Sequence, residues 1–380
     1  MSAHVSPARL GRLAPPLALV VIWLVMTLIN PRFLSAVNLT NLMLQIVAVG
    51  AVAVAVVLVL LIGEIDLSVG AVSGLGAGVT AVLSVKQDWP AVLAIVAGLL
   101  TGALVGLLHA TIVTRVGVAS FVVTLAGLLT WQGALQLVLG DTGTVNIDDP
   151  QLVAIAGTFL TPAAGWLIAA VIMAGAVVAV VAHVRGDRPR RVWPWVLAGT
   201  VAPVAVLVFN ADRGVPLAVV VFLLLIAGGD VVMRRTALGR HAVATGSNAS
   251  GARRAGIAVD RIRMTVFALA SVLAVIGGIL AASRLLAVNQ SSGSTDLMLT
   301  AVAAAAIGGA SLFGGRGTVW SALLGALVVG SLANGLDLLG ASSAIRLIAT
   351  GVVLALAVGL DTVAHRAERQ PFTEHSRPGR

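Results

Sequence analysis

The chain has 380 residues, of which 59% are hydrophobic and 10% are charged, and its formal net charge is +9. Soluble domains carry about 25% charged residues, so this composition excludes a water-soluble globular protein. Cysteine is absent, which excludes disulfides, cysteine-ligated metal sites and thiol catalysis. Lys86 is the single lysine and does not belong to a Gly-Lys-Ser/Thr sequence, so the chain lacks the P-loop that binds ATP.

Apolar segments of about the length that crosses a bilayer follow one another along the whole sequence. They lack the alternation of a membrane β-barrel, so we expect an all-α polytopic membrane protein. In chain order, about twelve transmembrane spans are predicted, give or take two, at 13–29, 43–62, 70–85, 91–110, 121–139, 163–183, 195–210, 216–232, 264–286, 297–312, 318–336 and 343–360. The short, glycine-rich spans among them are typical of broken helices inside a bundle.

The basic residues predict the orientation of the chain. If both termini are cytoplasmic, nineteen of the 24 Lys and Arg residues lie on the cytoplasmic side, and the longest outer loop, at 140–150, is acidic. Cytoplasmic loops of membrane proteins are enriched in Lys and Arg, so both termini are expected in the cytoplasm. The same rule explains the net positive charge, and nucleic acid is not expected as a partner.

Two parts of the sequence resemble each other. IDLSVGAVSGLGAGVTA, which begins at Ile65, aligns with TDLMLTAVAAAAIGGAS, which begins at Thr295, so that Asp66 matches Asp296. Further on, both parts contain GALV. The copies lie seven spans apart, an odd number, which predicts an inverted repeat with a pathway at its interface. We expect one transmembrane domain over 1–380, with a first repeat at about 43–139, inserted spans at about 163–210, a cytoplasmic loop at 233–263, a second repeat at about 264–360 and a cytoplasmic tail at 361–380.

The stretch GEIDLSVG, at 63–70, places Glu64 and Asp66 between two apolar spans. A charged side chain that faces lipid costs at least about 2.5 kcal/mol, so these carboxylates must face water, pair with other groups or lie at the aqueous edge. One interpretation is a plain cytoplasmic turn. The other is an unwound segment, broken at Gly63 and Gly70, at the mouth of a translocation pathway.

The longest basic loop is RRTALGRHAVATGSNASGARRAGIAVDRIRM, at 234–264. Asn248 is a good N-cap, 249–255 can form a short helix, and Gly256 suits a left-handed residue that ends it. A short capped helix on a cytoplasmic loop is typical of a docking element. The alternative is a basic loop without a partner.

Several of these stretches resemble a known family. GEIDLSVG, VASFVVTLAGLLTWQGAL, DRGVP, GRHAVATGSNASGARRAGI and GGASLFGGRGTVWSALLGALVVGSLANGL resemble the membrane permease subunits of monosaccharide ABC importers, most closely the xylose type. The resemblance runs from about Leu34 to Asp361 and includes the inserted spans and DRGVP, which distinguish the xylose type from shorter ribose-type permeases.

The resemblance implies a homodimeric permease of the type II importer architecture in the cytoplasmic (inner) membrane. An extracytoplasmic sugar-binding protein would deliver a monosaccharide, D-xylose or a related sugar, and a separate cytoplasmic ATPase subunit would drive transport. ATP and Mg²⁺ would bind that subunit, so no cofactor is expected on this chain. The loop would carry a coupling helix for the ATPase, with the family pattern at Gly239, Arg240, Gly246, Asn248, Gly251, Ala252, Gly256 and Ile257.

The coupling loop leaves some roles open. Arg253 and Arg254 of the coupling helix would meet acidic groups of the ATPase or stay solvated. Ser250 and Gly251 depart from the pattern, because relatives commonly carry Glu and Ala there.

Other polar residues within the spans could bond neighbouring helices or contact sugar hydroxyls. The candidate pathway residues are Glu64, Asp66, Ser68, Thr124, Gln132, Asp296 and Asn334. His109 and His183 lack a second ligand at metal spacing, so no metal site is expected, and no catalytic residue is identified.

Three other classes of function compete with this interpretation. A proton-coupled secondary transporter of a small polar solute would use Glu64, Asp66 or Asp296. An intramembrane enzyme would need a clustered nucleophile and base, or metal ligands, within the spans, and none is found. A channel would pass its substrate without ATP.

Overall fold

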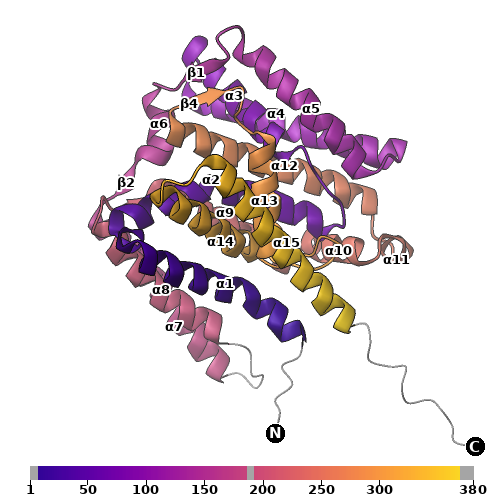
Figure 1. Ribbon diagram of the computed structural model, residues 1–380. Coiled ribbons are helices and arrows are strands. Elements are labelled where there is room, and N and C mark those ends of the chain that lie inside the picture. Colours follow the sequence, from indigo (N-terminus) through magenta and orange to yellow (C-terminus); the bar gives the residue numbers. More distant parts are fainter. Residues whose placement is uncertain (1–6, 186–191, 369–380) are drawn as a thin grey trace, which may run out of the picture.

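The computed structural model describes residues 7–185 and 192–368, which form an almost wholly helical bundle (Figure 1). Within these residues, nine helices are long and apolar enough to cross a membrane, and three shorter apolar helical stretches accompany them at Ala14–Ile29, Thr295–Ile307 and Ser343–Leu356. Each of the twelve predicted spans falls on one of these helices. The polytopic helical class is confirmed, and the number of crossings stays a prediction.

The helices, in chain order, are α1 (Pro7–Ile29), α2 (Ala36–Leu61), α3 (Val69–Ala81), α4 (Ala91–Thr111), α5 (Ser120–Leu139), α6 (Pro150–Gly157), α7 (Pro162–Arg185), α8 (Trp193–Asn210), α9 (Leu217–Arg235), α10 (Ala237–Ser247), α11 (Ala249–Arg254), α12 (Val259–Leu285), α13 (Thr295–Ile307), α14 (Trp320–Leu338) and α15 (Ser343–Glu368). Short helical turns follow α1, α3 and α4 as η1 (Pro31–Leu34), η2 (Val82–Lys86) and η3 (Ile112–Val116). Four short strands are β1 (Thr144–Asn146), β2 (Phe159–Leu160), β3 (Val215–Pro216) and β4 (Ala287–Asn289).

Helices α2 and α12 form the centre of the bundle. α2 is apolar on every side, as expected of a helix without an aqueous face, and most of its residues are buried. α12 packs against α2, α3 and α4, and α2 also packs against α13 and α14. The core therefore lies between two groups of helices that α2 and α12 join.

Glycines allow these helices to approach closely. Gly98, Gly102 and Gly106 recur every fourth residue in α4, a spacing that lets helix backbones touch in membranes. A Cβ at Gly98 would lie 2.6 Å from the carbonyl oxygen of Gly76 in α3, and a Cβ at Gly106 would lie 2.4 Å from that of Phe267 in α12. α4 is thus seated directly on the backbones of α3 and α12.

The pair α7 and α8 corresponds to the predicted inserted spans. The two helices pack mainly on each other at the periphery, and their apolar side chains are largely exposed, as expected for a lipid-facing hairpin (Figure 1). At its base, β2 pairs antiparallel with β3, with Leu160 opposite Val215. The β2–β3 pair therefore joins the chain just before α7 to the chain just after α8.

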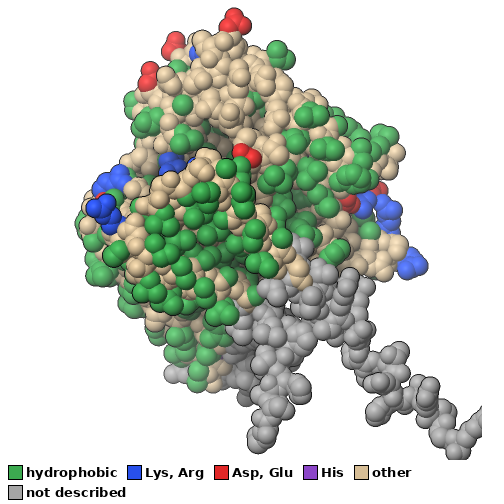
Figure 2. All heavy atoms as spheres, in the orientation of Figure 1, with side chains coloured by type: hydrophobic (Ala, Val, Ile, Leu, Met, Phe, Trp, Pro, Cys, Tyr) green, Lys and Arg blue, Asp and Glu red, His purple; other side chains and the backbone are tan. Residues whose placement is uncertain are grey.

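The bundle has two distinct ends. The start of α1, the end of α15, α10 and α11 lie at one end, which we call the loop end, and the four strands lie at the other, the strand end (Figure 1). Figure 2 shows hydrophobic side chains across the middle of one face, with charged side chains mostly towards its edges.

The span predicted at 297–312 is wrong at its C-terminal boundary. α13 ends at Ile307, and a loop runs from Gly308 to α14. Gly309 has φ +95° and Gly314 has φ +87°, backbone conformations that end a right-handed helix and favour glycine. α13 is therefore a short helix of 13 residues, whereas α3 continues through η2 to Lys86.

Candidate functional site

The acidic stretch lies between two helices, as the unwound-segment interpretation predicts, but the predicted break at Gly70 is wrong because α3 begins at Val69 and includes Gly70. α2 ends at Leu61 and α3 begins at Val69, and segment 62–68 between them is not helical, with Gly63 at φ +75°. Glu64 is 8% exposed and Asp66 is 4% exposed. The two carboxylates are therefore buried in an unwound segment, while Gly63 and Ile65 of the same segment are exposed.

Glu64 is paired with a basic residue of the central helix α12. Its Oε1 lies 2.5 Å from Nη2 of Arg263, and both side chains are largely shielded from solvent. Removing one partner of such a pair would leave an uncompensated buried charge. The ion pair therefore ties segment 62–68 to the first turns of α12.

Hydroxyl groups of α5 satisfy the backbone of the unwound segment. The amide of Ile65 donates to Oγ of Ser120 at 3.2 Å, and the amide of Leu67 donates to Oγ1 of Thr124 at 3.0 Å. Thr124 is fully buried and also donates to the carbonyl of Ser120. Since unpaired backbone groups are costly away from water, these hydroxyls allow the helix to open here.

Asp66 begins a chain of polar contacts that reaches α4 and α5. Its Oδ1 accepts from the Ser68 hydroxyl at 2.6 Å and from the Ser68 amide at 2.8 Å. Ser68 Oγ lies 3.4 Å from Nδ1 of His109, and the indole of Trp131 donates to Nε2 of His109 at 2.9 Å. Because Nε2 accepts from the indole, the proton of a neutral imidazole lies on Nδ1 and can point to the serine.

This network leaves one carboxylate oxygen open. Asp66 Oδ2 is buried and has no hydrogen-bond partner among the described residues. Asp66 lies between the spans Ala36–Leu61 and Val69–Lys86, and burial raises the pKa of its carboxyl, although its bonds from Ser68 oppose this effect. The group is thus less readily ionised than a surface aspartate.

The N-terminal end of α3 meets the chain that leads into α13. A Cβ on Gly74 would lie 2.2 Å from the carbonyl oxygen of Ser292, and one on Gly293, at φ +70°, would lie 2.2 Å from that of Gly70. Backbone therefore lies directly on backbone at this crossing. Asp296 is exposed in the first turn of α13, so the two aspartates that the repeat aligns have different surroundings.

The remaining candidate pathway residues lie elsewhere. Asn334 exchanges two amide hydrogen bonds with Asn38, at 2.9 and 3.1 Å, which join α14 to α2. Gln132 is half-buried on α5 and makes no side-chain hydrogen bond with the described residues. A role of these residues in substrate passage stays a prediction.

The short capped helix predicted at 249–255 is present as α11, and its role in coupling stays a prediction. Asn248 Oδ1 accepts from the amide of Gly251 at 2.8 Å, and Gly256 has φ +82°, so both the predicted N-cap and the predicted end are confirmed. The amide of Ile257 donates to the carbonyl of Ala252, a bond typical of a glycine-terminated helix. Helix α10, which Thr236 caps, precedes it and was not predicted.

The two arginines of α11 differ. Arg253 Nη2 lies 2.7 Å from Oδ1 of Asp260 in the first turn of α12. Arg254 is exposed and makes no ion pair or hydrogen bond with the described residues. Arg254 is thus the residue of this pair whose charge is open to a partner.

A polar cavity of about 370 Å³ lies beside α11 at the loop end. Glu64, Arg253, Arg263 and residues of the turn between α4 and α5 line it. The cavity therefore borders both ion pairs of this region.

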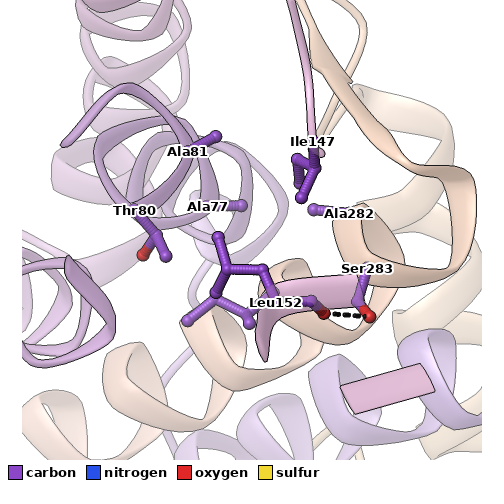
Figure 3. Close-up of a pocket in the computed structure, with 8 residues that line it drawn as sticks. Ala77, Thr80, Ala81, Ile147, Leu152, Ala282 and Ser283 are labelled. Atoms are coloured by element: carbon purple, nitrogen blue, oxygen red, sulfur yellow. Dashed lines mark hydrogen bonds between the residues drawn. The ribbon is translucent and has the colours of Figure 1, made fainter. Parts of the chain in front are cut away.

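A second, apolar cavity lies near the strand end, between α3, α12 and the start of α6 (Figure 3). It measures about 10 Å³, which is at the lower limit for one water molecule. Beside it, the Ser283 hydroxyl donates to the carbonyl of Leu152 at 2.6 Å. This region is therefore a packed seam and has no room for a substrate. In residues 7–185 and 192–368, no group of three His, Cys, Asp or Glu is suited to a metal ion.

Interrupted helices in a lipid-compatible bundle, with a capped helix on a basic loop, are typical of multi-pass membrane transport proteins. The chain belongs to the family described as branched-chain amino acid transport system / permease component, whose model matches residues 38–358.

Curated relatives support the resemblance found in the sequence. The chain is 36% identical to the xylose transport system permease protein XylH of Escherichia coli K12, over 88% of this chain and 87% of the relative. It is 35% identical to XylH of Haemophilus influenzae, over 87% and 90%, and 30% identical to the ribose import permease protein RbsC of Bacillus subtilis, over 92% of each chain. No solved structure matches the chain. The resemblance to monosaccharide ABC permeases is therefore confirmed.

The hydrogen bond to His109 yields a stability prediction. Replacing Trp131 with Phe keeps an aromatic ring but leaves Nε2 of the buried imidazole without its donor, which should lower the free energy of unfolding by about 1–3 kcal/mol. Thermal unfolding of the purified protein measures the loss. Trp166→Phe is the control, because Trp166 is 44% exposed and makes no hydrogen bond with the described residues. Equal losses in the two variants would contradict the assigned role.

Proposed function

We propose that this chain is the membrane permease subunit of an ATP-driven importer that carries a monosaccharide, D-xylose or a related sugar. The similarity to xylose and ribose permeases over about nine-tenths of the chain carries the proposal. The family description names branched-chain amino acids, which are the second substrate class to test. The identity to the xylose permeases is higher than that to the ribose permeases, which favours xylose over ribose as the sugar.

The loop end would face the cytoplasm and receive a separate ATPase subunit. Arginines gather in segments at this end, among them Arg234 and Arg235 in α9, Arg240 in α10, Arg253 and Arg254 in α11, and Arg261 and Arg263 in α12. Basic segments favour the cytoplasmic side. Both described chain ends lie there too, in agreement with termini inside. α11, with Arg254 exposed, is the element that the ATPase would contact.

An inverted repeat would organise the translocation pathway. α3 and α13 both follow unwound segments, and each is followed along the chain by a helix that packs against it, α4 and α14 respectively. α3 runs from the loop end towards the strand end, and α13 leads back to a loop that contacts Leu61. These opposed directions support the repeat, with a passage near the crossing of the two short helices. Cysteines introduced at positions 65 and 290 should react with a membrane-impermeant reagent from opposite sides of the membrane. Labelling of both from the same side would contradict the inverted repeat.

A second copy of the chain would complete the pathway. α5 is a candidate for the shared surface, because it exposes Gln136 and leaves Gln132 without a hydrogen bond among the described residues. Lipid could not satisfy these amides, whereas a second copy or sugar hydroxyls could. A single copy per assembled transporter, measured by native mass spectrometry, would contradict this part.

One observation favours a different function, a proton-coupled secondary transporter. Asp66 is buried, and its Oδ2 has no partner among the described residues, as in a carboxyl that takes up and releases a proton. No nucleotide would then be required. The alternative is weaker because it gives α11 no role.

Charge reversal on α11 tests docking and orientation together. Arg254→Glu should abolish co-purification with the ATPase subunit and sugar uptake, while membrane insertion is unchanged, because the exposed charge belongs to the docking helix. Arg32→Glu is the matched control, since Arg32 is exposed at the strand end. Loss of ATPase binding in the Arg32 variant but not in the Arg254 variant would place the docking face at the strand end. That result would contradict the proposed orientation.

Sugar uptake by the reconstituted system decides between the two functions. In proteoliposomes with the ATPase and binding-protein subunits, xylose uptake should require ATP and persist with a protonophore. Excess unlabelled xylose should compete more strongly than ribose, and leucine should not compete. Uptake that survives omission of the ATPase and collapses with the protonophore would overturn the importer and support the proton-coupled alternative.

A further inference from the structure

Three elements meet through glycine at the base of α11. Gly246, near the end of α10, contacts the end of α2 so closely that a Cβ there would lie 2.1 Å from the carbonyl oxygen of Leu61 and 2.8 Å from the amide of Gly315. The amide of Gly315 also donates to the carbonyl of Leu61 at 3.3 Å. Gly314, from the same loop after α13, lies on the backbone of Gly63. No flexible side chain separates these backbones.

The other side of α11 is tied to the same unwound segment. Arg253 of α11 pairs with Asp260 at the start of α12, and Arg263, one turn further along α12, pairs with Glu64. A Cβ on Gly63 would lie 3.3 Å from Cα of Gly246, so segment 62–68 contacts the chain just before α11 through glycine. It contacts the chain just after α11 through the ion pair of Glu64 with Arg263.

Residues 65–68 of this segment contact helices α4 and α5. Ile65 and Leu67 donate to hydroxyls of α5, and Asp66 connects through Ser68 to His109 of α4. Closely packed interiors transmit displacement because they have few voids to absorb it. A movement of α11 would therefore shift the break between α2 and α3, and α4 and α5 with it.

We propose that segment 62–68 is the element that receives the motion of α11, and that the Glu64–Arg263 pair and the Gly246 contact are its two connections. Glu64 then acts as a positioning residue, and its carboxylate is not used to bind sugar. The inference rests on the proposed function, since it needs an ATPase that moves α11.

The test measures sugar transported per ATP hydrolysed by the assembled transporter in proteoliposomes. Glu64→Gln and Arg263→Gln should each lower this ratio at least about fivefold, the lower end of typical coupling between sites, while the ATPase still co-purifies. Arg263→Lys keeps the charge and should retain most of the ratio. Arg234→Gln is the matched control, because its ion pair with Asp230 also lies near the loop end but does not involve segment 62–68.

A charge swap separates positioning from sugar binding. Glu64→Arg combined with Arg263→Glu should recover much of the ratio that either single change loses, since the pair is restored, whereas a carboxylate that binds sugar would not be recovered. Unchanged ratios in the Gln variants, or a swap no better than the single changes, would overturn the proposal. If a Gln variant does not assemble, the proposal is tested by the ratios of the charge-swapped variant and of Arg263→Lys alone, with the outcomes given above.

Failure of the proposed function would look different. Wild-type protein without ATP-dependent sugar uptake would overturn the importer itself. Normal wild-type uptake with unchanged ratios in the Glu64 and Arg263 variants would overturn only the connection through segment 62–68.

Discussion

Polar groups inside a lipid-facing bundle must find partners within the protein, and segment 62–68 is where this constraint is most demanding. Opening the central helix exposes backbone amides and brings two carboxylates into the interior. Ser120 and Thr124 satisfy the amides, and Arg263 neutralises Glu64. The rest of the arrangement follows from these partners, because they fix α5 and α12 relative to the break between α2 and α3.

The same constraint explains why glycine is used so densely. Helices that share little polar contact are held by close packing, and a hydrogen in place of a side chain lets backbones touch, as at Gly106 in α4 and Gly74 in α3. Where such contacts join a loop to a helix end, as at Gly246, they also form stiff connections. Under the proposed function, these connections would link the loop that receives the ATPase to the interior of the permease.

Local signals in the sequence predicted the helical class, the break at GEIDLSVG and both ends of α11, because periodicity, glycines and caps act within a few residues. The partners of the break could not be predicted in this way. Arg263 contacts the segment directly and Trp131 is connected to it through His109. Only the fold brings these side chains together, since no spacing in the sequence connects them. Helix α10 was missed because its glycines, threonine and serine have low helix propensity, and it is stabilised by the Thr236 cap and by burial of Ala242.

Distances by pulsed electron paramagnetic resonance test most directly whether segment 62–68 moves with α11. The chain has no cysteine, so spin labels can be placed at Ser250 on α11, at Ile65 in the segment and at Thr142 near the strand end, all of which are exposed. In the assembled transporter, diluted with unlabelled chain, the account predicts that ATP leaves the 250–65 distance unchanged and alters the 65–142 distance. A change between 250 and 65 with a constant 65–142 distance would contradict it.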